Sequence, residues 1–309
     1  AAWGSAVSDP SAVADLLEAA AACATAPLSP GWRELVDLSV AAREAARFKV
    51  DVSFSLLGIG ESGARLSVND KGEEVAFRER LREVAPSLGL AEPQLDAMLG
   101  VSPPGVVQTT LGVKWPDAGG APSRVTLYHE ELFRAADGAA LIAEVFHRFG
   151  ARPPEPRSGV EPGAVAVDIH REQVVGLKDY WIATEKSAAP TVALPKALEA
   201  FRRATPFARE RGTRRYLVAR RFDRAGDLVG HKLLWMSEAH EPAAVARAWA
   251  FVDDARRRLA LPASRASRAL DRLRSRWSHP ASLYPDLVSL DLDRDEQPLG
   301  LTVYVSLKG

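Results

Sequence analysis

The sequence predicts an α+β fold in which ten antiparallel strands close into a barrel that is surrounded by helices. Helical stretches alternate five times with pairs of short strands, and turns rich in Gly, Asp and Pro join the strands of each pair. Such turns mark antiparallel hairpins. Helices between hairpins, instead of between single strands, argue against a parallel doubly wound sheet. Because closure removes the exposed edges of a sheet, these strands favour a closed barrel.

The elements follow from hydrophobic periodicity and from the turn residues. The expected hairpins span residues 48–70, 106–131, 164–184, 214–237 and 287–308. The expected helices span residues 11–26, 32–47, 73–84, 92–99, 138–149, 194–204, 242–259 and 263–276. Together they predict one domain of five helix–hairpin repeats over residues 1–309. We expect residues 1–10 to be disordered or left over from cloning.

Composition narrows the function classes. The chain has 309 residues, of which 47% are hydrophobic, so it can bury a large core. Its 40 basic and 40 acidic residues cancel, which argues against nucleic acid or an acidic membrane as a partner. The single cysteine, Cys23, excludes an internal disulfide, and we expect it to be a buried helix residue. No apolar run reaches the roughly 20 residues of a membrane helix, and no signal-peptide pattern begins the sequence, so we expect a cytoplasmic protein.

Alternation within the strands predicts which side chains face the barrel interior. Val52 and Phe54 oppose Ser53 and Ser55, for example, and the apolar face must meet the apolar sides of the helices. A barrel of ten strands is wider than the eight-stranded kind that side chains can fill, so its polar interior can be a ligand chamber. The expected interior side chains are Arg65, Ser67, Gln108, Thr110, Lys114, Arg124, Tyr128, Lys178, Tyr180, Lys232 and Tyr304, with one of Arg215 or Arg221. The alternative is a basic strand face on an open sheet, exposed to water.

Several cations interleaved with phenols suit a polyanion, above all a diphosphate. Lysine and arginine supply charge, and tyrosines supply neutral donors and an aromatic wall. Asp179 does not fit this pattern, because it shares the helix-facing side of its strand with Leu177 and Trp181; we expect a salt bridge there.

Two motifs resemble ligand-binding sites, but a turn and a charged helix face explain them better. The stretch "GIGESG" at 58–63 matches a dinucleotide fingerprint, but a second strand follows it where that site requires a helix. The stretch "FVDDARRR" at 251–258 lacks the third acid of an aspartate-rich magnesium motif, so we expect a charged helix face.

The five helix–hairpin units carry a [K/R]-x-[aromatic or small polar] pattern on their second strands. The motifs are "ARLS" with Arg65, "RVTLY" with Arg124 and Tyr128, "LKDY" with Lys178 and Tyr180, "GHKLLW" with Lys232, and "LTVY" with Tyr304. From about residue 31 to residue 308, the chain resembles the aromatic prenyltransferases of the ABBA, or PT-barrel, family. The similar members are bacterial indole and phenol prenyltransferases and cyanobactin peptide prenyltransferases, which act in natural-product (secondary) metabolism.

The resemblance implies an enzyme that transfers a prenyl group from dimethylallyl or geranyl diphosphate to an aromatic acceptor, an indole, a phenol or a peptide containing Trp or Tyr. It implies a monomer acting by electrophilic substitution. The candidates for diphosphate binding are Arg65, Lys114, Arg124, Lys178 and Lys232. The candidates for shielding the cation and contacting the acceptor are Tyr128, Tyr180 and Tyr304.

Two departures from the family pattern shape the remaining expectations. Where a magnesium-dependent branch carries aspartate, this chain has Arg65, so we expect no required cofactor or metal, although Mg²⁺ could still bind. Indole-acting members carry a glutamate base on the first strand, which is absent here. The catalytic base is therefore one of Asp51, Asp168, His170 and Asp291. The missing glutamate keeps open a second function, a non-catalytic barrel that carries an anionic or phosphorylated small molecule.

Overall fold

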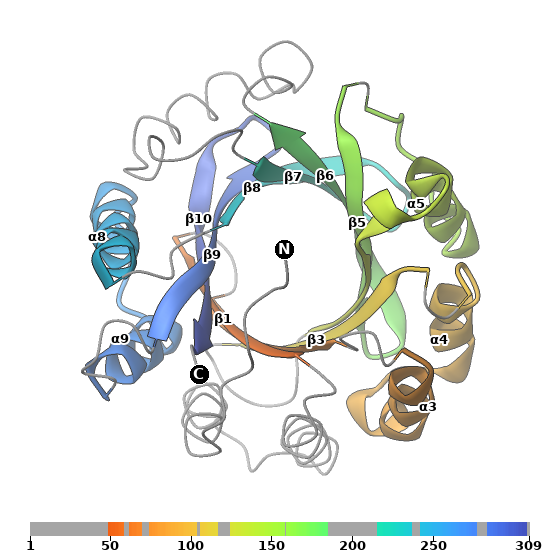
Figure 1. Cartoon of the computed structure of the whole chain (residues 1–309), viewed down its shortest axis with the longest axis horizontal. Helices are drawn as coiled ribbons and strands as arrows, with labels where there is room; N and C mark the ends of the chain where they lie inside the picture. Colours follow the sequence, from red (N-terminus) through yellow and green to blue (C-terminus); the bar gives the residue numbers. More distant parts are fainter. Residues whose placement is uncertain are drawn as a thin grey trace.

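A closed antiparallel barrel forms the centre of the molecule (Figure 1). The computed structural model describes residues 49–58, 62–69, 74–103, 106–116, 124–157, 159–184, 215–236, 242–276 and 283–307. Within these ranges ten strands are hydrogen-bonded in the order β1-β10-β9-β8-β7-β6-β5-β4-β3-β2. The last hairpin therefore pairs with the first, and the predicted fold class is confirmed.

The strands lie where the sequence predicted hairpins. They are β1 (Lys49–Leu57), β2 (Gly63–Asn69), β3 (Gln108–Pro116), β4 (Arg124–Glu130), β5 (Glu161–His170), β6 (Gln173–Thr184), β7 (Arg215–Phe222), β8 (Leu228–Met236), β9 (Leu283–Asp293) and β10 (Pro298–Leu307). Every hairpin turn joins an odd-numbered strand to the next even-numbered one, so all five turns lie at one end of the barrel. We call this the turn end.

The helices lie outside the barrel wall (Figure 1). They are α3 (Glu74–Val84), α4 (Glu92–Leu99), α5 (Gly138–Arg148), α8 (Pro242–Arg258) and α9 (Arg265–Arg276), with two short 3₁₀ helices, η1 (Pro86–Leu88) and η2 (Leu132–Arg134). The helices expected at 11–26, 32–47 and 194–204 fall outside the described residues, as do Cys23 and residues 1–10. None of the described helices is long and apolar enough to cross a bilayer.

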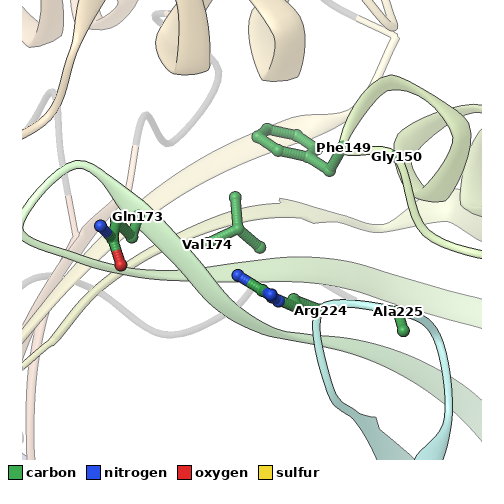
Figure 2. A pocket seen from close by; sticks show the side chains of 6 residues that line it. All are labelled: Phe149, Gly150, Gln173, Val174, Arg224 and Ala225. Atoms are coloured by element: carbon green, nitrogen blue, oxygen red, sulfur yellow. The ribbon is translucent and has the colours of Figure 1, made fainter.

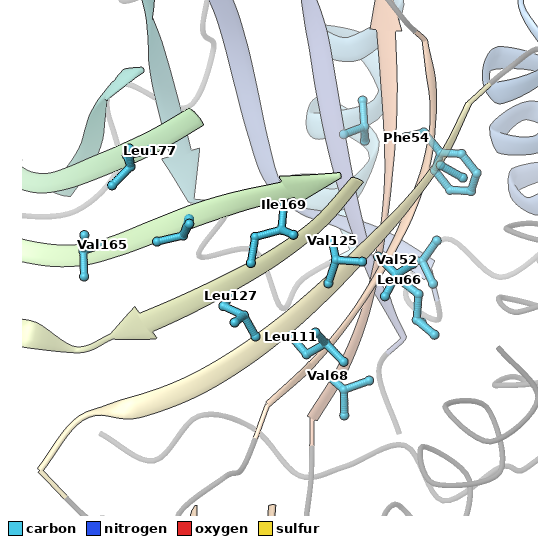
Figure 3. Packing of buried hydrophobic residues seen from close by; sticks show 14 of the residues in the cluster. Val52, Phe54, Leu66, Val68, Leu111, Val125, Leu127, Val165, Ile169 and Leu177 are labelled. Carbon is cyan, nitrogen blue, oxygen red and sulfur yellow. The ribbon is translucent and has the colours of Figure 1, made fainter. Parts of the chain in front are cut away.

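The hydrophobic core lies between the barrel wall and the helices, not inside the barrel. Val52, Phe54 and Leu66 belong to one buried cluster with Phe77 of α3 and Leu270 of α9. Figure 3 shows strand residues of this cluster along neighbouring strands, all from the apolar face that the alternation predicted. Because this face packs against helices, the opposite face of every strand is left to line the lumen.

Two strands begin several residues earlier than predicted, because each includes a proline, a residue that is not expected inside a strand. β5 and β9 start three or four residues ahead of the expected 164 and 287, and the added segments contain Pro162 and Pro285. Both prolines lie beside shifts in the strand register. Since a bulge leaves backbone groups unpaired, it tolerates a residue that has no N–H to donate.

Asp179 lies on the helix-facing side that its parity predicted, and it forms a salt bridge there. It is fully buried and pairs with Arg220 of β7, while the indole nitrogen Nε1 of Trp181 donates to its Oδ2 at 2.8 Å. The guanidinium of Arg220 also donates to the Glu155 carbonyl at 2.9 Å. This network holds β6 and β7 together on the helix side and leaves the lumen face to other residues.

The stretches at 58–63 and 251–258, which resemble a dinucleotide fingerprint and a magnesium motif, belong to a hairpin and to a helix. The stretch "GIGESG" links β1 to β2, which pair antiparallel, so it joins the two strands of a hairpin. On α8, Asp253 pairs with Arg274 of α9 at 2.9 Å, and Asp254 pairs with Arg258 at 2.6 Å. These ion pairs form the charged helix face that the sequence predicted.

A buried histidine gives the fold a pH dependence. His129 of β4 is 1% exposed, its Nε2 lies 2.8 Å from the carbonyl of Met98, and burial lowers its pKa to about 4. The folded protein therefore keeps His129 neutral at pH values where the unfolded chain is already protonated. This stabilisation is complete above about pH 6.5 and is lost as the pH falls from there towards 4.

We expect this single group to remove about 2 kcal/mol of unfolding free energy between pH 7 and pH 5. His129→Gln keeps an amide donor for the carbonyl of Met98 but cannot titrate. In urea unfolding at the two pH values, the variant should lose about 2 kcal/mol less than the parent protein. Equal losses would show that His129 does not carry the effect.

Candidate active site

A row of three cations crosses one wall of the lumen. Arg65 of β2 pairs in register with Lys114 of β3, and Lys114 pairs with Arg124 of β4. Directly paired residues on neighbouring strands lie about 5 Å apart on the same face. All three lie in the half of their strands nearer the turn end, so positive charge is concentrated there. We call these residues the cation row.

Two further cations, Lys178 and Arg221, lie on the lumen face of β6 and β7. Lys178 pairs in register with Arg221, and Arg221 also lies close enough to Asp291 to lower its pKa. The sequence left Arg215 and Arg221 as alternatives; the structure places Arg221 among the lumen residues. The side chain of Arg215 is outside the described part.

Asp168 of β5 lies among these cations. Lys178 Nζ is 2.7 Å from Oδ1, Arg124 Nη1 is 3.1 Å from Oδ2, and the Thr126 hydroxyl donates to Oδ1 at 2.8 Å. Asp168 and Lys178 are each 4% exposed, so little water screens their attraction. Burial alone would raise the pKa of this carboxyl, but Lys178, Arg124 and Arg65 hold it well below its usual range. Asp168 is therefore ionised and weakly basic.

Asp291 of β9 has a similar arrangement with fewer cations. Lys232 Nζ of β8 lies 2.8 Å from Oδ1, and the Thr302 hydroxyl of β10 donates to Oδ2 at 2.9 Å. The Ser55 hydroxyl of β1 lies 3.3 Å from that of Thr302. Burial raises the pKa of Asp291, but Lys232 outweighs it, and the pKa stays below its usual value.

Tyrosines border the cations towards the middle of the barrel. The guanidinium of Arg65 donates to the Tyr128 hydroxyl and lies 5.9 Å from the centre of that ring. The rings of Tyr128 and Tyr180 are 6.2 Å apart. Burial raises the pKa of Tyr128 to about 12 and that of Tyr180 well above its ordinary value, so both phenols are neutral donors at neutral pH. Tyr304 of β10 is close enough to contribute to both pKa shifts.

An apolar cluster lies in the half of the lumen away from the turn end, on the wall formed by β4 to β9. Tyr128 and Tyr180 pack there in a buried cluster that is separate from the helix-side core. The other members are Ala164, Ala166, Ala219 and Leu234, with Leu217 and Leu287 packed against them. Ala164, Leu217, Leu234 and Leu287 lie in the part of their strands farther from the turn, while Ala166 and Ala219 lie near mid-strand, paired with Lys178 and Lys232. The lumen is therefore polarised along its axis, with cations at the turn end and apolar groups beyond them.

Strand parity predicted these positions well. The strand pairing places Ser67, Thr110 and Lys232 on the lumen face with the cations and tyrosines named above. Gln108 is the first residue of β3, and His170 is the last of β5. The backbone of Asp51 pairs with Ser67, but its side chain lies outside the described part.

The sequence reasoning missed Thr126 and Thr302 as partners of the two carboxylates. Both belong to the polar faces that the alternation identified, and that is the signal that could have marked them. Among the described residues, no group of three or more His, Cys, Asp and Glu side chains could hold a metal ion.

A depression of about 610 Å³ lies outside the barrel, against the end of α5 and the turns of two hairpins (Figure 2). Its lining residues are Phe149, Gly150, Gln173, Val174, Arg224 and Ala225. It contains none of the cations or tyrosines of the lumen, so the polar lumen remains the candidate site.

No family model and no curated protein matches the sequence. Solved structures do. The chain superposes on 5-dimethylallyltryptophan synthase from Streptomyces coelicolor with a TM-score of 0.66 and 17% identity over 98% of each chain. For 6-dimethylallyltryptophan synthase from Micromonospora olivasterospora, solved in complex with DMASPP and Trp, the TM-score is 0.65 with 20% identity over 98% of each chain.

The NotF prenyltransferase is a third structural neighbour, with a TM-score of 0.59 and 13% identity over 96% of this chain and 92% of the other. All three likenesses span nearly the whole of both chains, so they extend over the closed barrel of ten strands and the helices around it. The chain therefore has the ABBA, or PT-barrel, fold that the resemblance in its sequence implied.

Proposed function

We propose that this protein is an aromatic prenyltransferase that transfers a dimethylallyl or geranyl group from its diphosphate to an aromatic acceptor. The observation that carries the proposal is the axial polarity of the lumen. An allylic diphosphate has a polyanionic head and an apolar tail, and the lumen face has the cation row towards one end and the apolar cluster towards the other. The acceptors and donors of the solved neighbours agree with this class.

The proposed reaction begins when the bond between C1 of the prenyl group and the diphosphate oxygen breaks. The electron pair leaves with the diphosphate, whose growing charge is stabilised by Arg65, Lys114, Arg124, Lys178 and Lys232. Because Lys114 and Lys178 are buried and the other three cations are half-buried, these groups need little rearrangement as the charge develops. Arg65 provides a fixed positive charge, and this supports a reaction without a required metal.

The allylic cation would then lie beside Tyr128, Tyr180 and Tyr304. Their ring faces can stabilise it, and their bulk keeps water away. Since burial keeps Tyr128 and Tyr180 protonated, neither is a phenolate that would trap the cation. A ring carbon of the acceptor attacks C1, and a base removes the proton from that carbon to restore aromaticity.

We propose Asp291 as that base. Asp168 carries two cations, and Arg65 also lowers its pKa, whereas Asp291 has a single ion pair, with Lys232. Through Thr302, Asp291 also connects to Ser55 on β1, the strand on which the related indole enzymes are expected to carry a glutamate. The carboxylate would thus be supplied from β9. Asp51 and His170 remain the other candidates.

The test is incubation with dimethylallyl or geranyl diphosphate and a panel of indoles, phenols and peptides containing Trp or Tyr. Mass spectrometry should find an acceptor that has gained one prenyl group, and EDTA should not prevent it. Stabilisation by diphosphate without product across the panel would contradict the proposal and favour a carrier. Size-exclusion chromatography during purification checks the expectation of a monomer.

A further inference from the structure

Asp168 is a negatively charged residue inside the proposed binding site for the negatively charged diphosphate. It contacts Lys178 and Arg124, two cations that the proposed mechanism assigns to the diphosphate. Lys178, Asp168 and Thr126 are at most 4% exposed, so the contact with Lys178 lies within the protein, while the Arg124 side chain is 32% exposed. The carboxylate of Asp168 is thus the counter-ion of these two cations.

The position of the carboxylate follows from a bulge in the hairpin. Asp168 pairs with Gly176, the next pair is Ile169 with Val174, and Val175 is the extra residue, 44% exposed. Gly176 permits this arrangement, since a Cβ there would lie 2.9 Å from the carbonyl oxygen of Phe222. The bulge therefore belongs to the local backbone that presents Asp168 to Lys178.

A bound diphosphate and Asp168 would be neighbouring anions that share the same cations. At separations of several ångströms in a buried site, repulsion between like charges is large compared with thermal energy. The attraction of Lys178 and Arg124 for the diphosphate is weakened to the extent that they still attract Asp168. Burying a carboxylate among the cations of an anion site therefore lowers the affinity of that site.

We propose that Asp168 is an internal competitor of the diphosphate. It holds Lys178 and Arg124 in position when no diphosphate is bound, and it weakens their attraction for the diphosphate that the reaction leaves behind, so that this product can depart. This inference rests on the proposed function, because it takes the lumen cations as the diphosphate site. Asp168 is in these terms a positioning residue that acts through the two cations.

Whether Asp168→Asn raises or lowers the affinity for inorganic diphosphate separates this role from a purely structural one. If Asp168 only orients Lys178 and Arg124, then Asp168→Asn should weaken the binding of inorganic diphosphate. If Asp168 competes, the same variant should bind inorganic diphosphate more tightly, by about tenfold or more. Asparagine keeps the shape and an oxygen that can accept from Thr126, while it removes the charge.

Asp291→Asn is the matched control. Asp291 is also buried, paired with a lysine and hydrogen-bonded by a threonine, but it pairs with one of the proposed diphosphate cations, Lys232, whereas Asp168 pairs with two. Both substitutions add one positive charge to the lumen, so a general charge effect would tighten binding equally in both. Competition at Asp168 predicts that Asp168→Asn tightens binding at least threefold more than Asp291→Asn does.

The experiment is isothermal titration calorimetry with inorganic diphosphate at constant ionic strength. Unchanged or weaker binding by Asp168→Asn, or equal gains in both variants, would overturn the proposal. If Asp168→Asn is only marginally stable, thermal unfolding gives the same answer, because inorganic diphosphate should raise its melting temperature more than that of the parent protein. A smaller rise would also overturn it.

A failure of the proposed function can be distinguished from a failure of the competition by combining diphosphate binding with the prenyl-transfer assay. If inorganic diphosphate binds with the expected order of affinities but no acceptor is prenylated, the competition stands and the transferase assignment does not. If the parent protein transfers prenyl groups but Asp168→Asn binds inorganic diphosphate no more tightly, only the competition fails. If inorganic diphosphate binds to none of the proteins, both are rejected.

Discussion

Replacing Lys178 by alanine is expected to lower kcat/KM for the prenyl diphosphate about 100- to 1000-fold. Lys178 is buried and in register with Arg221, next to the cation row, so its ammonium is among the groups that face the departing diphosphate. Loss of one preorganised charge from a buried site typically has an effect of this size on the reaction rate. Steady-state kinetics with the acceptor found in the panel measures it.

The fold should survive this substitution. Asp168 would lose Lys178 but keep Arg124 and Thr126, so its carboxylate would not be left buried without a partner. Circular dichroism and the melting temperature check this. Arg224→Ala, at an exposed turn residue of the β7–β8 hairpin, is the control and should keep activity within about twofold. Full activity of Lys178→Ala would show that Lys178 does not serve the diphosphate.

Replacing Asp291 by asparagine is expected to lower kcat about 100-fold or more, with a smaller change in the KM for the prenyl diphosphate. Asparagine can still accept a hydrogen bond from Thr302, but it cannot take a proton from the acceptor ring. The loss should therefore appear mainly in the chemical steps.

An isotope effect distinguishes proton removal from a change in shape. With the acceptor deuterated at the ring carbon that becomes prenylated, the parent enzyme should show little effect on kcat if ionisation is slow. Asp291→Asn should show a primary isotope effect, because proton removal has become limiting. A variant with normal kcat, or a slow variant without an isotope effect, would assign the base to another of the candidates.

The faces of the strands could be predicted because alternation is a local property. The side chains of Lys178 and Tyr180 point the same way in any strand, and the apolar partners on the other face identify the side that meets the helices. For the same reason the outward position of Asp179 could be predicted, although alternation does not identify its salt-bridge partner, Arg220.

The partners of the carboxylates could not be predicted in this way. Asp168 meets Lys178 across a hairpin with a bulge at Val175, and sequence alternation does not show where a bulge falls. The lumen positions of Asp168 and Asp291 followed from parity, but their ionisation depends on cations from neighbouring strands. Only the assembled barrel shows that each carboxylate is paired with a lysine and a threonine.

By itself, the sequence determined that this chain builds a barrel from five hairpins, with helices on one face and a basic, tyrosine-rich lumen on the other. These features depend on patterns that repeat within a few residues. The tertiary structure decided which charges meet. Barrel closure brings together groups such as Ser55 and Thr302, which are 247 positions apart, and the strand register then sets which cation lies beside which carboxylate.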